Sequence, residues 1–212
     1  MAKGLFDNDI LVKLCAYNLH EDVLIQFHID RVIVLDSLYF RRNDVDWLER
    51  KRCQQKPEWA QRLSATLQQT QPVGAVDPEL LVRMENLGPG VDPGEALLLT
   101  AAITEEDVLF LTGDKRFLKS LTTNISKLPN QKLLNGKLLF LEFIILHFLN
   151  IYSLDWLKNK IAPERECDTY LRSVFGSGMT STENNVRDGL EREVNRLRSI
   201  LGDLLYPLPY SF

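Results

Sequence analysis

Three acidic residues stand at positions where a parallel sheet would bring carboxylates together. Asp7 follows the short apolar run Leu5-Phe6, and Asp114 comes shortly after the apolar run 108–111. Glu95 lies in the first turn of an expected helix that begins at Asp92-Pro93. In an open α/β sheet, ligands collect at the carboxyl ends of the strands. The fold is therefore expected to place these three acids, which are far apart in sequence, in one crevice.

Clustered carboxylates favour a particular chemistry. Held a few ångströms apart, they repel one another and raise one another's pKa. A hard cation such as Mg²⁺ or Mn²⁺ relieves the repulsion, because it prefers oxygen ligands. A metal held in this way can lower the pKa of a bound water and neutralise charge on an attacked phosphate. We therefore take Asp7, Glu95 and Asp114 as candidate catalytic and metal-binding residues, with Mg²⁺ or Mn²⁺ as the expected cofactor.

The sequence elements that must position these acids alternate between strand and helix. Segments rich in β-branched or apolar residues predict strands at 5–6, 31–40, 108–111 and 137–141. Helical spacing of apolar residues predicts one or two helices over 10–24, further helices within 44–71 with a new start at Pro57, and helices after Asp77 and Asp92. Such alternation predicts an α/β fold with a central, mostly parallel sheet flanked by helices in three layers.

The chain changes character near residue 160. We predict a domain over 1–160 and a helical extension over 161–212. The extension has a short helix at 170–175 and a longer one after Thr180 and Glu183, which have capping-box spacing. The longer helix carries an apolar stripe, made of Val186, Leu190, Val194, Leu197 and Leu201. This stripe is expected to pack on the domain or on a second copy of the chain, so a homodimer is predicted.

Three short motifs, in this order, resemble those of the PIN-domain nucleases. The segment 5–11, Leu-Phe-Asp-Asn-Asp-Ile-Leu, looks like the first strand motif of that family. Pro93-Gly94-Glu95-Ala96 is similar to its internal acidic helix, and 111–117, Leu-Thr-Gly-Asp-Lys-Arg-Phe, resembles its Thr-x-Asp-Lys-x-Phe signature. The resemblance covers about residues 4–150. It implies a PIN-like fold and a divalent-metal nuclease, most of the family being ribonucleases.

The resemblance also implies roles for single residues. Asp7, Glu95 and Asp114 would bind the metal, with Thr112 as a polar helper and Asp9 in an outer position. The family usually has a further Glu in the helix after the second strand, which this chain lacks. Asp36 is the nearest acid and our candidate for that place, ahead of Asp44 and Asp46, although a structural role is the simpler reading of Asp36. RNA would be the substrate, with single-stranded DNA as a second one, and the toxins of the family imply an antitoxin protein as a partner.

Basic residues near these motifs are candidate contacts to phosphate. They are Arg41, Arg42, Lys115 and Arg116, with the run 50–52 as a further cluster. The alternative is that each run is simply a solvated face. Trp47 and Trp59 are expected in the core.

Two other functions start from the same residues. The segment 6–10 also resembles the haloacid-dehalogenase phosphatase motif, with Asp7 as a nucleophile. That family places another acid a few residues after the Gly-Asp pair, and this chain has none between Lys115 and Leu118. The missing Glu after the second strand instead favours a PIN-like scaffold that binds without cutting.

Composition sets the remaining expectations. The formal net charge is −4, so any nucleic-acid site must be a local patch rather than a property of the whole surface. The cysteines Cys15, Cys53 and Cys167 are scattered and odd in number, which is typical of a reduced compartment. The densest apolar stretch, 138–149, is interrupted by Glu142 and too short to span a bilayer. A soluble, cytoplasmic protein is predicted.

Overall fold

A five-stranded, all-parallel sheet forms the centre of the computed structural model, which describes residues 2–128 and 131–207. The strand order is β3-β2-β1-β4-β5. The strands are β1 (Ala2–Phe6), β2 (Ile29–Val34), β3 (Thr70–Pro72), β4 (Val108–Thr112) and β5 (Leu138–Phe140). The prediction of an α/β fold with a parallel sheet between helices is confirmed.

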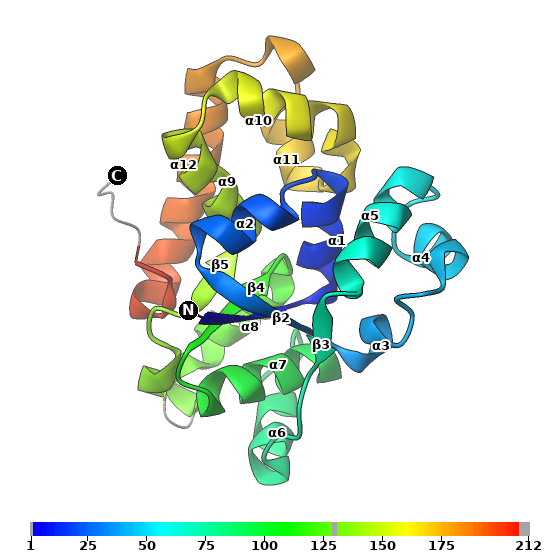
Figure 1. Ribbon diagram of the computed structural model, residues 1–212. Coiled ribbons are helices and arrows are strands. Elements are labelled where there is room, and N and C mark those ends of the chain that lie inside the picture. Colours follow the sequence, from blue (N-terminus) through cyan, green and yellow to red (C-terminus); the bar gives the residue numbers. More distant parts are fainter. Residues whose placement is uncertain (1, 129–130, 208–212) are drawn as a thin grey trace.

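Helices connect the strands and cover both faces of the sheet (Figure 1). The connecting helices are α1 (Asn8–Ala16), α2 (His20–Gln26), α3 (Asp36–Tyr39), α4 (Val45–Lys51), α5 (Pro57–Leu67), α6 (Pro78–Glu85), α7 (Pro93–Thr104) and α8 (Lys115–Asn124). The helices that follow β5 are α9 (Leu141–Ile151), α10 (Leu154–Ile161), α11 (Thr169–Val174) and α12 (Glu183–Leu201). In Figure 1, α1, α2 and α5 lie on one side of the sheet and α6 and α7 on the other.

The two central strands are apolar because both of their faces are covered. All five residues of β4 are buried, and Leu5 and Phe6 of β1 are fully buried. Strands buried on both faces read as continuous apolar runs rather than alternating ones. This is why 108–111 was recognisable as a strand in the sequence.

Two elements near the second strand differ from the prediction. Strand β2 ends at Val34, and residues 36–39, predicted as its continuation, form the short helix α3. The β-branched and aromatic residues in this region favour strand locally, but this is a weak preference that tertiary contacts override. Strand β3 overlaps the end of the stretch 44–71, which was predicted as helix, and its three residues are too few to give a periodic signal.

The C-terminal helices share the core of the chain. Helix α12 packs against α9, and its apolar stripe Val186, Leu190, Val194, Leu197 and Leu201 is buried within the same chain. The stripe therefore cannot serve as the dimer surface from which a homodimer was inferred. The cap of α12 also differs from the prediction, since Thr182 rather than Thr180 accepts the hydrogen bond, from the Asn185 N–H.

Among the described residues, no helix is both long enough and apolar enough to span a membrane.

The packing of α12 can be tested by comparing two aliphatic residues of this helix, one buried and one exposed. Leu190→Ala removes a side chain that is 0% exposed and should lower the free energy of unfolding by about 2–5 kcal/mol. Ile200→Ala, on the same helix but 45% exposed, should change it by less than about 0.5 kcal/mol. Urea denaturation measures both. Equal effects of the two substitutions would contradict intramolecular packing of this helix.

Candidate functional site

The strand order creates a crevice at the end of β1 and β4. From β1 the chain crosses to β2 on one side, while β4 lies on the other side of β1 and continues to β5. Ligands of open α/β sheets bind outside the carboxyl ends of the strands at such a point of reversal. Phe6 pairs with Leu111, and Thr112 is the last residue of β4, so Asp7 after β1 and Asp114 after β4 leave the sheet close to one another.

A cleft of about 330 Å³ opens at this edge. It contains the three predicted acids Asp7, Glu95 and Asp114, and it contains Asp92 as well. The other residues that line it are Asn8, Asp9, Leu35, Ser37, Arg52, Pro93 and Gly94. The fold thus brings together the acids that the sequence placed on two strand ends and one helix start. We call this hollow the acidic cleft.

Asp7 occupies the N-cap position of α1 but does not act as a cap. Its side chain makes no capping hydrogen bond to the helix, and the residue is 9% exposed. One carboxylate oxygen lies 3.5 Å from the hydroxyl of Thr112, which donates to it. Helix capping therefore does not account for an acid at this position.

Glu95 and Asp92 form a capping box at the start of α7. The Asp92 carboxylate accepts from the Glu95 N–H at 2.8 Å, and the Glu95 carboxylate accepts from the Asp92 N–H at 2.9 Å. Gly94 lets this helix start approach the end of β2, since a Cβ there would lie 2.6 Å from a methyl group of Leu35. The reciprocal cap fixes both acids against the wall of the cleft.

Asp114 caps the first turn of α8. Its carboxylate accepts from the backbone N–H groups of Arg116 and Phe117 at 2.6 and 3.1 Å, and from the Arg116 guanidinium at 3.0 Å. The Asp114 N–H donates to the hydroxyl of Thr112 at 3.1 Å. Thr112, which is 0% exposed, therefore links Asp114 to Asp7 through its hydroxyl.

The electrostatics of the cleft follow from burial and mutual repulsion. Burial, together with the carboxylates of Asp9, Asp92 and Asp114, raises the pKa of Asp7 to about 6. Burial and the nearby Asp92, Asp114 and Asp7 raise the pKa of Glu95 to about 8. Burial acts in the same direction on Asp114, but the bonds from Arg116 and the Phe117 N–H outweigh it and hold its pKa below the usual range. Asp114 is thus the most readily ionised of the three.

Asn8 and Asp9, the next two residues, have different surroundings. The Asn8 amide donates to Ser37 at 3.2 Å, while its carbonyl oxygen is buried and has no hydrogen-bond partner among the described residues. Asp9 forms an ion pair with Lys13 at 2.5 Å, and Lys13 also pairs with Asp168 at 2.9 Å. Asp9 therefore lies at the rim of the cleft, held by a lysine.

Several predicted residues lie outside the acidic cleft. Asp36, the candidate fourth ligand, is exposed at the start of α3 and is not part of the lining. Arg41 pairs with Asp44 at 3.4 Å, and the Arg42 guanidinium donates to the Tyr39 carbonyl at 3.0 Å. Arg116 is exposed and bonded to Asp114.

Lys115 has structural contacts in place of the phosphate contact expected for it. Its ammonium lies 2.6 Å from Glu142 of α9 and 3.2 Å from Glu193 of α12, and 3.8 Å from the ring centroid of Tyr170. Glu142 is 3% exposed. Lys115 thus joins the start of α8 to the C-terminal helices.

The side chains of the cleft offer oxygen atoms, the ligand type that hard cations prefer. The cleft offers five carboxylates, of which that of Asp9 is paired with Lys13, and the unpartnered oxygen of Asn8. Oxygen donors of this kind suit Mg²⁺ and Mn²⁺. As the side chains stand, no three acidic, His or Cys groups in the described part of the chain are arranged closely enough to hold an ion. Glu95 and Asp114 use carboxylate oxygens in their helix caps, so a cation would compete with the Asp92 N–H and Arg116 for them.

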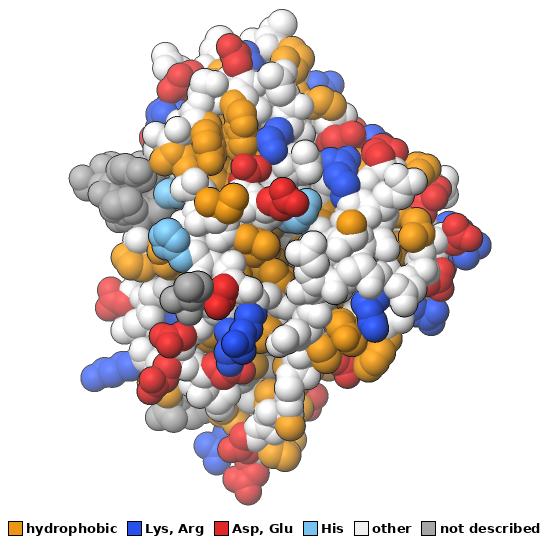
Figure 2. Space-filling view, in the orientation of Figure 1, with side chains coloured by type: hydrophobic (Ala, Val, Ile, Leu, Met, Phe, Trp, Pro, Cys, Tyr) orange, Lys and Arg blue, Asp and Glu red, His pale blue; other side chains and the backbone are white. Residues whose placement is uncertain are grey.

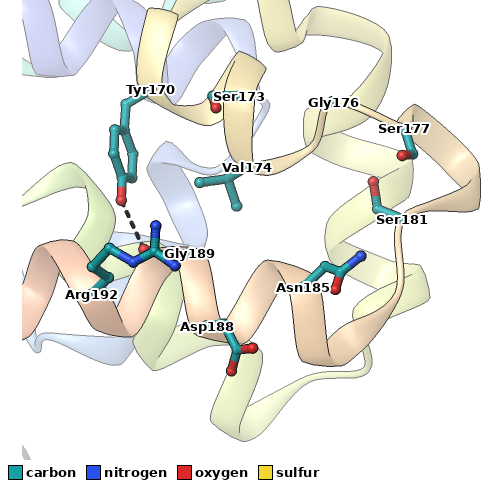
Figure 3. Close-up of a pocket in the computed structure, with 10 residues that line it drawn as sticks. All are labelled: Tyr170, Ser173, Val174, Gly176, Ser177, Ser181, Asn185, Asp188, Gly189 and Arg192. Carbon is teal, nitrogen blue, oxygen red and sulfur yellow. Dashed lines mark hydrogen bonds between the residues drawn. The ribbon is translucent and has the colours of Figure 1, made fainter.

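A second pocket, of about 410 Å³, lies between α11 and α12 (Figure 3). Its walls carry serine hydroxyls, the Asn185 amide and the Arg192 guanidinium, and Asp188 is its one acid. At one end, the Tyr170 hydroxyl donates to the Gly189 carbonyl at 2.7 Å. With a single carboxylate it does not compete with the acidic cleft as a cation site.

Comparison with family models, with curated proteins and with solved structures found no match to this chain. The candidate site therefore rests on the residues and geometry described above.

Sequence reasoning did not select Asp92 or Asn8 as members of the cleft lining, and it included Arg52 only as part of the basic run 50–52. For Asp92 a signal existed, because the spacing Asp-Pro-Gly-Glu is that of a capping box and ties Asp92 to Glu95. Asn8 stood between two acids already selected. For Arg52 no local pattern distinguishes it from its basic neighbours at 50 and 51.

The raised pKa of Asp7 predicts a pH-dependent effect on stability. Because its folded-state pKa is about 6 against an ordinary 3.8, its stabilising contribution is complete below about pH 4 and lost as the pH rises through 6. Asp7→Asn should therefore raise the free energy of unfolding at pH 8 in EDTA by up to about 3 kcal/mol, and much less at pH 4.

Thermal melting at the two pH values measures this difference. The exposed Asp30→Asn, at the opposite end of β2, is the control and should change neither melting temperature. A melting temperature of Asp7→Asn that falls at pH 8 would contradict the proposed repulsion.

Lys115 gives a second test at the edge of the site. Lys115→Ala leaves Glu142 buried without its partner and should lower the free energy of unfolding by about 3 kcal/mol. Adding Glu142→Gln should recover part of the loss, because the unpaired charge is removed. Urea denaturation of the two single variants and the double variant measures the coupling. Lys119→Ala, at an exposed position of the same helix, is the control. If Lys115→Ala lowers the free energy of unfolding no more than Lys119→Ala does, the structural role of Lys115 is refuted.

Proposed function

We propose that this protein is a divalent-metal-dependent nuclease with a PIN-like fold, which hydrolyses phosphodiester bonds of RNA in the acidic cleft. The observation that carries the proposal is the convergence of Asp7, Asp92, Glu95 and Asp114 on one cleft at the reversal point of a parallel sheet. The motif resemblance, which includes Asp7, Glu95 and Asp114 in this order along the chain, supports the PIN-like assignment and the choice of RNA.

The repulsion among these acids supports a cation as their natural partner. Asp7 and Glu95 have raised pKa values because burial and neighbouring carboxylates disfavour their ionised forms. Elsewhere in the chain, the buried Asp168 is paired with Lys13 at 2.9 Å. Such pairing is absent for Asp7, Asp92 and Glu95 among the described residues, so their charge is left for a ligand to balance.

Each residue then has a chemical task. Asp7, Asp92, Glu95 and Asp114, with the carbonyl oxygen of Asn8, would hold Mg²⁺ or Mn²⁺, which supplies Lewis-acid activation of water and neutralisation of phosphate charge when bound. Thr112 orients Asp7 through its hydroxyl and fixes the Asp114 backbone. Arg116 keeps Asp114 ionised at neutral pH. Arg52, on the wall of the cleft, is placed to contact a phosphate.

A cleavage assay tests the proposal. Purified protein is incubated with a 5′-labelled single-stranded RNA in Mn²⁺, in Mg²⁺ and in EDTA. We expect cleavage only with metal, and a loss of more than about 100-fold in Asp7→Asn, Glu95→Gln and Asp114→Asn, beyond the 10- to 100-fold typical of residues that only orient a ligand. Asp92→Asn removes the negative charge of Asp92 but keeps its capping of α7, because Asn is also a good N-cap residue. This variant therefore tests the charge apart from the cap. Asp30→Asn should cleave normally.

Other outcomes would point to the alternative functions. Absence of both cleavage and Mn²⁺ binding by calorimetry would favour a binding scaffold without activity. A trapped aspartyl-phosphate at Asp7 would favour a phosphatase of the haloacid-dehalogenase type.

A further inference from the structure

An exposed aromatic residue, Phe40, directly follows helix α3. The side chain is 70% exposed, and its backbone continues the right-handed turn of α3 with φ −72° and ψ −9°. Ser37, three residues earlier, lines the acidic cleft. Residues three apart lie on the same face of a helix, with Cβ atoms about 5–6 Å apart. Phe40 therefore stands one turn along from the wall of the cleft.

The neighbouring aromatic rings are already covered by arginines. The Arg42 guanidinium lies 4.2 Å from the ring centroid of Tyr39. Arg41 and Arg52 lie 5.2 and 5.5 Å from the ring centroid of Trp47. In the described part of the chain, no lysine or arginine lies over the ring of Phe40, which meets Tyr39 edge-to-face at 5.4 Å. Phe40 is thus the ring of this group that remains open to a ligand.

Unpaired cations accompany this ring. Among the described residues, Arg42 and Arg52 form no ion pair, whereas Arg41 pairs with Asp44. Arg52 also belongs to the lining of the cleft, so the positive charge continues into it. Figure 2 shows basic side chains beside apolar ones over α3 and α4. We call Phe40, Arg41, Arg42, Trp47 and Arg52 the α3–α4 face.

The chemistry of this face suits one kind of partner. An open aromatic ring offers a flat surface for a nucleobase, and guanidinium groups bind the phosphates on either side of it. A base that stacks on a side chain must be free of its neighbours, which holds for a single strand and not for a duplex. The acidic cleft by itself repels a phosphate chain, so arginines at its edge also offset that repulsion.

We propose that Phe40 is the platform on which an unpaired base of the bound strand stacks, with Arg42 and Arg52 contacting the adjoining phosphates. The inference rests on the proposed function, because the strand is placed by the cleft in which it is cut. It adds a specificity-determining site outside the cluster of acids, and it makes Phe40 a positioning residue.

Fluorescence anisotropy of labelled RNA tests this site apart from cleavage. The probe is a labelled 12-nucleotide single-stranded RNA of mixed sequence, free or annealed to its complement, in EDTA at fixed salt. The unsubstituted chain is compared with Phe40→Ala, Phe40→Trp and a matched control, Ile25→Ala, a residue of α2 that is 67% exposed. Equal melting temperatures check that each variant is folded.

We expect Phe40→Ala to weaken binding of the single strand by about 5- to 150-fold, the range for loss of one base–aromatic stack. Phe40→Trp and Ile25→Ala should bind within about threefold of the parent, since Trp still stacks and Ile25 is remote. Binding of the duplex should not depend on residue 40. An RNA with one abasic position should bind the parent protein as weakly as the intact RNA binds Phe40→Ala. The abasic position should cause no further loss of affinity in Phe40→Ala, because the same stacking contact is already absent.

Several results would overturn the proposal. They are unchanged binding by Phe40→Ala, equal weakening by Phe40→Ala and Phe40→Trp, additive losses in the abasic series, and no binding of single-stranded RNA by the parent protein. Binding that depends on Phe40 without metal-dependent cleavage would remove the proposed function and keep this site. Metal-dependent cleavage with unchanged kcat/KM in Phe40→Ala would remove the site and keep the function.

Discussion

The parallel pairing of β1 with β4 is the constraint on which the site depends. Its register, from Lys3 with Val108 to Phe6 with Leu111, sets the level at which both strands end. Burial of both strands against helices on either face holds that register, because any slip would expose apolar side chains. Asp7 and Asp114 are therefore neighbours even though more than one hundred positions separate them in the chain.

Bringing these acids together lowers the stability of the fold through charge repulsion. Nearby hydrogen-bond donors and Arg116 offset part of this repulsion. Asp114 is offset by Arg116 and by the N-terminus of α8, and Glu95 and Asp92 satisfy each other's backbone N–H groups. For Asp7, burial and the nearby Asp9 carboxylate outweigh the bond from the Asn8 N–H, so its pKa stays raised. Repulsion among carboxylates that lowers stability is expected at a functional site, because a bound cation can relieve it.

The C-terminal helices belong to the same arrangement. Lys115 directly follows Asp114 and is held by Glu142 of α9 and Glu193 of α12. The cleft is also lined by Ser37 of α3 and by Arg52, which directly follows α4. The acids are thus placed between a buried ion-pair network and an exposed aromatic and basic face. The ion-pair network holds Lys115 next to Asp114, and the exposed face is the surface proposed to bind RNA.

The sequence by itself determined what depends on neighbouring residues. The apolar runs of β1 and β4, the capped starts of α6 and α7 and the apolar stripe of α12 were predictable, because burial pattern and capping are local signals. These elements were enough to predict a parallel sheet and the meeting of Asp7, Glu95 and Asp114. Only the tertiary structure decided that Lys115 is an internal ion pair, that α12 packs within its own chain, and that Arg52 and Asp92 face the cleft. Such assignments depend on partners distant in sequence, whose identity no local pattern encodes. The same holds for α3 and β3, where contacts with the rest of the fold outweigh the weak preferences of a few residues.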